Sequence, residues 1–207
     1  ADAVKFQVFD VDEMLVEDQK EWRDRLSPRQ LPYDAFIRIQ KYCKTKAITF
    51  FATAHDEKSL DFLAQIKVPV YKIGSGELGN PEYFRKIARL GKPVIFSTGM
   101  YEFSDIEAAL DIFRQERNEN ICILHCVTSY PTPPVDAGLL NIQNIKEKLS
   151  VITGYSDHTE AMHIPLAAVA LGAKVIEKHI TLDFDIPNAQ DWKVSCGPEN
   201  LKTFVSQ

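Results

Sequence analysis

The sequence predicts an α/β fold, namely a (β/α)8 barrel that lacks its first βα unit. Seven short β-rich runs alternate with helical patterns along the 207 residues, and strands joined by helices of this length pair in parallel. Reactive side chains follow nearly every run, whereas a doubly wound sheet would gather them at one switch point. Since a closed barrel needs eight strands, we expect the first βα unit to lie upstream of Ala1.

The predicted strands are runs rich in β-branched and aromatic residues, and they cover 3–7, 47–53, 70–75, 93–98, 121–126, 150–156 and 174–180. Helical patterns predict helices over 34–43, 57–65, 81–90, 104–116, 140–149, 164–171 and 197–205. Ser104, with Glu107 three residues later, has the pattern of a capping box. Gly91 and Gly172 follow their helices as C′ glycines. No linker divides the chain, so residues 1–207 are predicted to form one catalytic barrel domain.

Composition excludes several classes of partner. The formal net charge of −5 offers no general attraction for nucleic acid or anionic lipid. The longest apolar run, 164–173, is far shorter than a membrane span. The four cysteines lack the paired spacing of a zinc site, and we expect Cys122 and Cys126 to be buried on one strand face. We therefore predict a cytoplasmic protein that acts on small molecules.

Two histidines stand at the ends of neighbouring predicted strands. Side-chain alternation places Glu177 and His179 on one face of the last strand, and it places His158 on the matching face beyond the strand before. Two imidazoles with a carboxylate nearby suit a divalent ion such as Mn²⁺, Zn²⁺ or Fe²⁺. The alternative is that each histidine is a hydrogen-bonded structural residue, which is how we interpret His55.

Two lysines, Lys5 and Lys72, lie within predicted strands that are otherwise apolar. A buried lysine must be paired or must bind an anion. One hypothesis is a pocket for phosphate or carboxylate, with hydroxyls from Ser75, Ser97, Thr98 and Ser156. The alternatives are a Schiff-base lysine and a plain ion pair with Glu77 or Glu177.

Eight short motifs follow one another along nearly the whole chain: ADAVKFQ, FFATAHD, VYKIGSGE, GKPVIFSTGM, LHCVTSYPTPP, GYSDHT, LGAKVIEKHITLD and SCGPENL. In this order and spacing they resemble the sialic acid synthase (N-acetylneuraminate synthase) family. The resemblance implies a (β/α)8 barrel followed by a small antifreeze-like domain, in a domain-swapped homodimer. It also implies condensation of phosphoenolpyruvate with an N-acylated hexosamine, such as N-acetylmannosamine or a diacetamido-hexose, to a nine-carbon 2-keto sugar acid and phosphate. Such acids enter surface polysaccharides.

Residue by residue, the resemblance implies how the site is divided. The metal ligands fall on His158 and His179, with Mn²⁺ as the cation and Mg²⁺ or Co²⁺ as alternatives. Catalytic charge clamps fall on Lys5 and Lys72. Further phosphoenolpyruvate contacts fall on Thr53, Ser75, Ser97, Thr128 and Ser156. Sugar contacts fall on Gln7, Glu77, Tyr130 and Asp191.

The end of the last strand and the loop after it carry the remaining expectations. Glu177 and Lys178 are expected to be supporting groups beside His179. Residues 187–192, PNAQDW, depart from the Pro-Gly-Pro-Asp-His of many relatives, which leaves the sugar open. The family's first strand and antifreeze-like domain are expected to lie outside 1–207.

Two other interpretations of the function remain. One is another phosphoenolpyruvate–aldose condensing synthase, which would need a second phosphate site. The other is a non-catalytic sugar-binding remnant.

Overall fold

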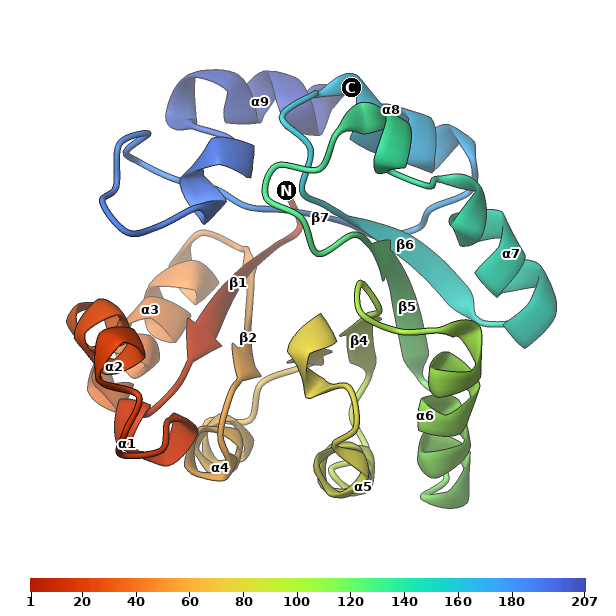
Figure 1. The fold of residues 1–207 in the computed structure, drawn as a ribbon. Coiled ribbons are helices and arrows are strands. Elements are labelled where there is room, and N and C mark those ends of the chain that lie inside the picture. The colour runs from red at the N-terminus through yellow and green to blue at the C-terminus, as the bar shows by residue number, and fades with distance from the viewer.

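Seven parallel strands form one curled sheet in the computed structural model, which describes residues 1–207 (Figure 1). Each strand pairs with its neighbours in the chain, so the order across the sheet runs from β1 to β7. The strands are β1 (Ala3–Val8), β2 (Thr49–Ala54), β3 (Tyr71–Ile73), β4 (Val94–Ser97), β5 (Ile121–Cys126), β6 (Ile152–Asp157) and β7 (Ile176–Lys178). This arrangement confirms the predicted fold class, a (β/α)8 type of barrel with one βα unit fewer than the complete form.

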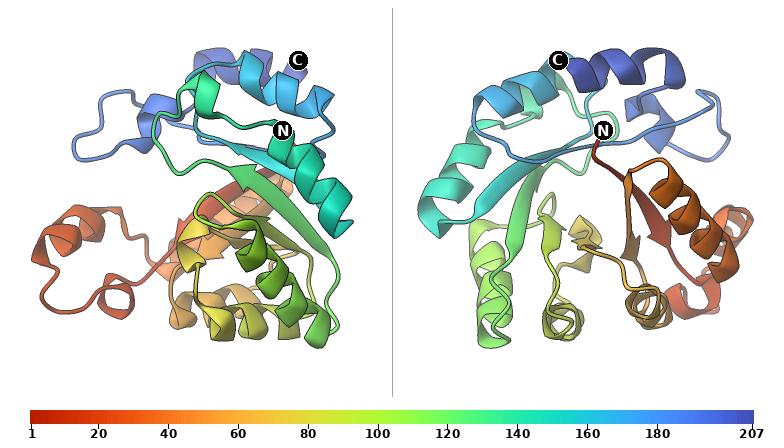
Figure 2. Two further views of the ribbon diagram at one scale, coloured as in Figure 1. Left: turned by 45° about the vertical axis from the view of Figure 1, so that its right-hand side comes forward. Right: turned by 180° about the vertical axis from the view of Figure 1, so that it is seen from behind.

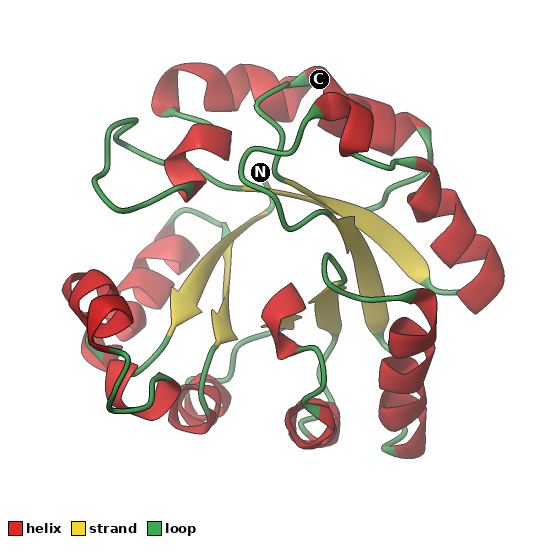
Figure 3. Cartoon of the chain, in the orientation of Figure 1, coloured by secondary structure: helices red, strands yellow, loops and turns green.

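Helices lie around the outside of the curled sheet (Figure 3). They are α1 (Val11–Met14), α2 (Lys20–Leu26), α3 (Tyr33–Thr45), α4 (Glu57–Gln65), α5 (Pro81–Arg89), α6 (Phe103–Gln115), α7 (Leu140–Leu149), α8 (His163–Ala170) and α9 (Pro198–Ser206). Short 3-10 helices occupy Ser27–Arg29, Ser75–Glu77, Pro134–Asp136 and Asp191–Val194. None of the helices combines the length and the apolar character that crossing a membrane requires.

Local capping chemistry explains where several helices begin and end. At the start of α4, the N–H of Ser59 donates to Oδ1 of Asp56 at 2.7 Å, which satisfies a helix donor that has no partner within the helix. Gly91 and Gly172 follow α5 and α8 with φ of +63° and +102°. Both predicted C′ glycines are therefore confirmed.

The predicted N-cap of α6 is wrong. The helix begins at Phe103 and its N-cap is Glu102, whose N–H donates to Oδ2 of Asp105 at 2.9 Å. Ser104 is thus inside the helix rather than at its cap. A carboxylate reaches the cap N–H from the third helical position, and that position belongs to Asp105, not to Glu107.

Strands β3 and β7 each end two residues before the end that the sequence predicts. β3 ends at Ile73 and β7 at Lys178, so several residues placed in strands begin loops instead. The side chain of Ser75, for example, turns toward the loop after β4, where its Oγ accepts the N–H of Gly99 at 2.8 Å. These loop starts carry the side chains of the candidate site.

The main apolar core lies between the sheet and the helices. Its aromatic rings pack in pairs, with centroids 5.6 Å apart for Phe6 and Phe50 and 5.4 Å apart for Phe84 and Phe96. Burial of each such side chain stabilises the fold by roughly 1.5–3 kcal/mol. All four cysteines are free and buried in the chain. Because this core takes one set of alternating strand residues, the other set faces the interior of the curl.

Two long loops project from the end of the sheet at which the strands finish (Figure 2). One covers 9–32 and contains α1 and α2; the other covers 181–197. They meet where a guanidinium N–H of Arg29 donates to the carbonyl oxygen of Pro187 at 3.1 Å. Both loops therefore stand beside the strand ends at which the functional residues were predicted.

Candidate active site

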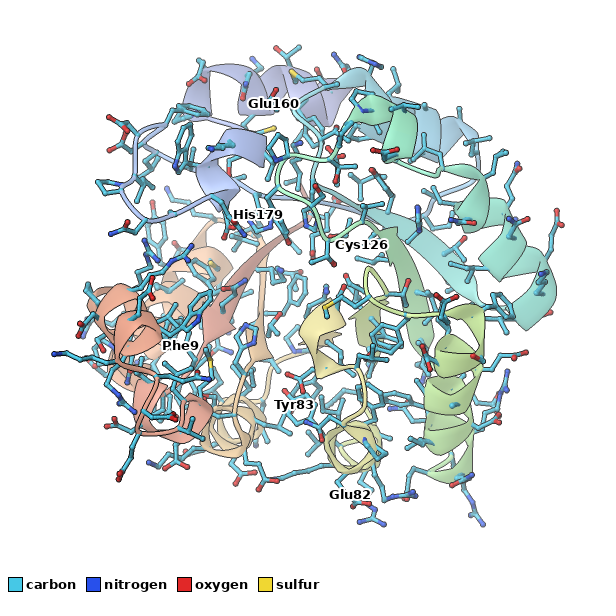
Figure 4. The ribbon with its side chains drawn as sticks, in the orientation of Figure 1. Phe9, Glu82, Tyr83, Cys126, Glu160 and His179 are labelled. Carbon is cyan, nitrogen blue, oxygen red and sulfur yellow. The ribbon has the colours of Figure 1, made fainter.

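The ends of the strands bring most of the predicted site residues onto the inner side of the sheet. In Figure 4, Cys126 and His179 lie toward the interior, whereas Glu82 lies on the outer rim. Strand register places Ser156 opposite Glu177. The buried members of the predicted set are Thr53, Lys72, Ser97, Ser156 and His158. The interior at this end is therefore polar and largely shielded from solvent.

Lys72 is the most buried of the interior cations, with a side chain only 2% exposed. Its Nζ donates to Oγ of Ser97 at 2.6 Å and to the carbonyl oxygen of Ile73 at 2.8 Å. Burial lowers the pKa of Lys72 to about 8, against the opposing effect of Glu177. At neutral pH the group is mostly protonated, so it presents a positive charge to the interior.

Glu177 binds both predicted lysines. Its Oε1 lies 3.3 Å from Nζ of Lys5 and 3.8 Å from Nζ of Lys72, and it accepts a hydrogen bond from Oγ of Ser156 at 3.0 Å. Burial raises the pKa of Glu177, but the charges of the two lysines outweigh that effect and lower it to about 2. The predicted ion pair is therefore formed, and its partner is Glu177. Glu77 instead accepts a hydrogen bond from Nδ2 of Asn80 at 3.0 Å.

A backbone cradle stands beside these lysines. Gly99 donates its N–H to Ser75, as described above, and it has no room for a side chain. A Cβ on Gly99 would stand 2.4 Å from Oγ1 of Thr128 and 3.1 Å from both Oγ of Ser75 and Sγ of Cys126. The two predicted hydroxyl contacts thus pack directly against a glycine backbone, and only glycine leaves room for both of them at this position.

The two predicted metal ligands are neighbours. The ring centroids of His158 and His179 are 5.5 Å apart, and the ring of Tyr130 lies 4.0 Å from that of His158 and 5.9 Å from that of His179. Nδ1 of His158 donates to the carbonyl oxygen of Val127 at 2.7 Å. Because a carbonyl can only accept, this bond fixes the proton on Nδ1 and leaves Nε2 with a free lone pair.

Both imidazoles are neutral at physiological pH. Burial lowers the pKa of His158, partly offset by the hydrogen bond to Val127. Burial likewise lowers the pKa of His179 to about 4, with the charge of Asp191 acting in the opposite direction. A neutral ring with a fixed tautomer and a free nitrogen is the form that binds a divalent cation. Two neutral imidazoles side by side are therefore a donor set that fits a divalent cation.

Three predicted contacts are less closely tied to this centre. Gln7 is exposed at the end of β1 and lines a groove with His55 and the apolar side chains of the 9–32 loop. Burial raises the pKa of Glu77 in the 3-10 helix after β3. Asp191 is exposed at the start of the last 3-10 helix. Gln7 and Asp191 therefore stand beside or within the two long loops, and Glu77 lies in the connection that follows β3.

Sequence reasoning missed two parts of this site. Cys126 was interpreted only as a buried thiol, yet its Sγ lies 3.6 Å from Nδ1 of His158; its place on the inner face, next to Ser156 in the register, was the available signal. Gly99 was not singled out. Its role depends on Cys126 at the end of β5, Thr128 in the loop after it and Ser75 after β3. No sequence pattern near Gly99 predicts these contacts.

Known proteins resemble this chain in both sequence and fold. The NeuB family model matches residues 1–207. The N,N'-diacetyllegionaminic acid synthase of Campylobacter jejuni is 41% identical over 180 residues, which cover 86% of this chain and 54% of that protein. The crystal structure of an N-acetylneuraminic acid (sialic acid) synthetase from Leptospira borgpetersenii has a TM-score of 0.93 at 37% identity, covering 100% of this chain and 71% of that one.

A further solved structure agrees. The spore coat polysaccharide biosynthesis protein SpsE of Bacillus subtilis has a TM-score of 0.88 at 37% identity, covering 100% of this chain and 58% of that one. The chain spans little more than half the length of the curated relatives that it matches. A family match over every residue, with relatives at this identity, shows that the chain belongs to the NeuB family.

Proposed function

We propose that the protein condenses phosphoenolpyruvate with an N-acylated hexosamine, giving a nine-carbon 2-keto sugar acid and phosphate with the help of a divalent cation. One observation carries the proposal. Two lysine ammonium groups and two neutral imidazoles face the same interior space: Lys5 and Lys72 lie within β1 and β3, and the two histidines directly follow β6 and β7. An anionic and a neutral, oxygen-rich reactant can therefore be held side by side.

The lysine half of the site suits phosphoenolpyruvate. Lys5 and Lys72 supply two positive charges, and the hydroxyls of Ser75, Ser97 and Ser156 lie beside them. Preorganised donors of this kind stabilise charge that develops in a transition state. The Nζ of Lys72 is already engaged by Ser97, Ile73 and Glu177, which suits a fixed charge clamp better than a Schiff-base nucleophile.

The imidazole half suits the sugar aldehyde. His158 and His179 would hold Mn²⁺, with Mg²⁺ or Co²⁺ as alternatives, and a bound cation supplies a Lewis acid for the aldehyde oxygen. Residues 1–207 contain no group of three or more His, Cys, Asp or Glu side chains placed to bind one ion. Two imidazoles from this chain leave coordination positions for oxygen donors, including those of the substrate.

The bond changes follow from these positions. Carbon 3 of phosphoenolpyruvate forms a bond to carbon 1 of the open-chain sugar, whose oxygen takes up a proton. Water adds at carbon 2, and its two protons are released: one replaces the proton that the sugar oxygen takes up, and the other leaves with phosphate as the bond between carbon 2 and its bridging oxygen breaks. Lys5 and Lys72 balance the charge of the phosphate and carboxylate throughout. Tyr130, whose ring lies against His158, packs beside the sugar.

The names of relatives support this class of reaction. The family includes proteins named as synthases of N,N'-diacetyllegionaminic, N-acetylneuraminic and pseudaminic acids. The loop 187–192 borders the sugar side of the site through Asp191. Because this loop departs from the pattern of relatives, several N-acylated hexosamines are candidate substrates.

The test is an incubation of the full-length protein with phosphoenolpyruvate, Mn²⁺ and a panel of aldoses, read by phosphate release and by 2-keto acid formation. Turnover with an N-acylated hexosamine that stops on chelation is the expected result. Turnover with phosphorylated aldoses alone would move the protein to the other condensing synthases. No turnover with any sugar, despite tight Mn²⁺ binding, would indicate a sugar-binding remnant.

Two histidine variants control the experiment. His179→Ala removes one of the two interior imidazoles, and we expect turnover to be lost. His163→Ala changes an exposed imidazole at the start of α8, and we expect turnover to be retained. Equal loss in both variants would mean that the effect comes from folding rather than from the site.

A further inference from the structure

An ion pair lies on the face of the sheet opposite to the candidate active site. Nζ of Lys178 is 2.6 Å from Oδ2 of Asp157, and the two side chains are 6% and 0% exposed. The two residues are partners in the register of β6 and β7. Side chains alternate along each strand, so this pair points outward, while the preceding pair, Ser156 and Glu177, meets on the inner face.

The same two residues close the turn that carries His158. Nζ of Lys178 donates to the carbonyl oxygen of Thr159 at 2.5 Å. The N–H of Thr159 donates to the other carboxylate oxygen of Asp157, Oδ1, at 3.0 Å. The backbone on both sides of His158 is therefore tied to one cluster of charged groups, which holds the direction in which the imidazole leaves the strand.

The ion pair also sets the alignment of the two strands immediately before the imidazoles. The register pairs Asp157 with Lys178, and the next residues along the two strands are His158 and His179. Their separation depends on how β6 and β7 are aligned at this last pair. A shift of one strand relative to the other at this pair would change the distance between the two imidazole rings.

Stability alone is a weak explanation for such a pair. Burying two charges costs desolvation, and well-packed apolar residues in the same place are often equally stable or more so. Lys178 points away from the interior, so it cannot touch a substrate there. What the pair provides beyond stability is a fixed geometry for the residues on either side of it.

We propose that Lys178 is a positioning residue: through Asp157 and Thr159 it holds His158 at the spacing from His179 that a shared divalent cation requires. The inference rests on the proposed function in assigning the cation to these two imidazoles. Groups that orient metal ligands from outside typically contribute 10–100-fold to metal affinity.

The test uses three variants of the full-length protein. Lys178→Met removes the ammonium and keeps the length of the side chain. The double variant K178M/D157N also removes the unpaired carboxylate charge, while its new side-chain amide oxygen can still accept the N–H of Thr159. Arg85→Met is the matched control, because it breaks an ion pair with Glu116, at 3.0 Å, between α5 and α6, remote from the imidazoles.

Three quantities are measured for each variant: the free energy of unfolding, the Kd for Mn²⁺ alone by calorimetry, and the imidazole N–H signal of His158 by NMR. We expect Lys178→Met to lose stability, because it leaves Asp157 buried and unpaired, and to raise the Kd by about 10–100-fold. The double variant should regain stability and still bind Mn²⁺ weakly. Arg85→Met should bind as the unmodified protein does.

Two outcomes would overturn the proposal. One is a folded Lys178→Met that binds Mn²⁺ as tightly as the unmodified protein. The other is a double variant in which affinity returns together with stability, since that would make the pair purely structural.

The NMR signal separates this inference from the proposed function. The Nδ1–H of His158, bonded to Val127, should give a slowly exchanging signal that is lost or broadened in Lys178→Met. If the unmodified protein binds no Mn²⁺, the proposed metal site fails, and this signal still decides whether Lys178 positions the ring. Its persistence in Lys178→Met would contradict the positioning role.

Discussion

Nζ of Lys5 lies 3.3 Å from Oε1 of Glu177, so one ion pair joins the first strand of the sheet to the last across the interior. The same oxygen contacts Lys72 and Ser156. Glu177 thus gathers polar groups from three other strands around a single carboxylate. The two ammonium groups are thus held in fixed positions, and this preorganisation underlies the first prediction.

Replacing Lys72 with Met is expected to separate activity from stability. The change removes a buried cation and the donor to Ser97, so kcat/KM should fall by at least about 100-fold. The free energy of unfolding should change by no more than about 1 kcal/mol, because burial already disfavours the charged form of Lys72. Turnover assays and urea unfolding measure the two effects. Lys58→Met, which alters an exposed pair with Glu13, is the control; comparable activity in both variants would contradict the charge-clamp role.

Replacing Gly99 with Ala should weaken phosphoenolpyruvate binding. The new methyl group would stand 2.4 Å from Oγ1 of Thr128 and 3.1 Å from Oγ of Ser75, so both hydroxyls must move. We expect KM for phosphoenolpyruvate to rise by about tenfold or more, which corresponds to about 1.4 kcal/mol. Gly76→Ala is the control, because a Cβ there has open space. An unchanged KM in Gly99→Ala would show that the hydroxyls packed against Gly99 do not contribute to phosphoenolpyruvate binding.

Replacing Gly154 with Ala should destabilise the sheet. A Cβ at this position of β6 would stand 2.3 Å from the carbonyl oxygen of Val175 and 2.6 Å from Cδ2 of Leu124. Overpacking of this kind costs about 1–3 kcal/mol, measurable by urea unfolding. Gly74→Ala, in open space, should have little effect. Equal stability of the two variants would mean that Gly154 does not approach Val175 this closely.

His55 predicts a specific dependence of stability on pH. Burial lowers the pKa of His55 to about 4, against about 6.5 in an unfolded chain. Between these values the unfolded state binds the additional proton, so stability is retained above pH 6.5 and falls as the pH drops toward 4. The loss should be about 1–3 kcal/mol. In His55→Gln the unfolding free energy should vary less over this window; parallel curves would show that His55 is solvated.

Much of the fold and the centre of the site could be predicted from the sequence, because they depend on periodicity. Alternation along strands placed Glu177 and His179 on one face, and helix-ending glycines such as Gly91 marked the turns. The alignment of His158 with His179 followed from parallel pairing of neighbouring strands. These are relationships between residues in one strand or in two consecutive ones.

Other features could not be predicted because they depend on geometry that periodicity does not contain. Which glutamate pairs with Lys5 is decided by the curvature of the sheet, which brings β1 within reach of Glu177 and leaves Glu77 aside. The outward pair of Asp157 and Lys178 has the composition of any charged strand end. The cap at Glu102 was missed because a serine nearby fits the usual pattern better than a glutamate does.

The order of the strands across the sheet is also their order along the chain. During synthesis, each strand after β1 therefore has a pairing partner that has already been made, separated from it only by the crossover between the two strands. The contact of Lys5 with Glu177 differs, because Lys5 is synthesised long before Glu177. The positive charges of the interior are balanced only when β7 has been synthesised. Until that stage, a nascent chain contains Lys5 and Lys72 but not Glu177.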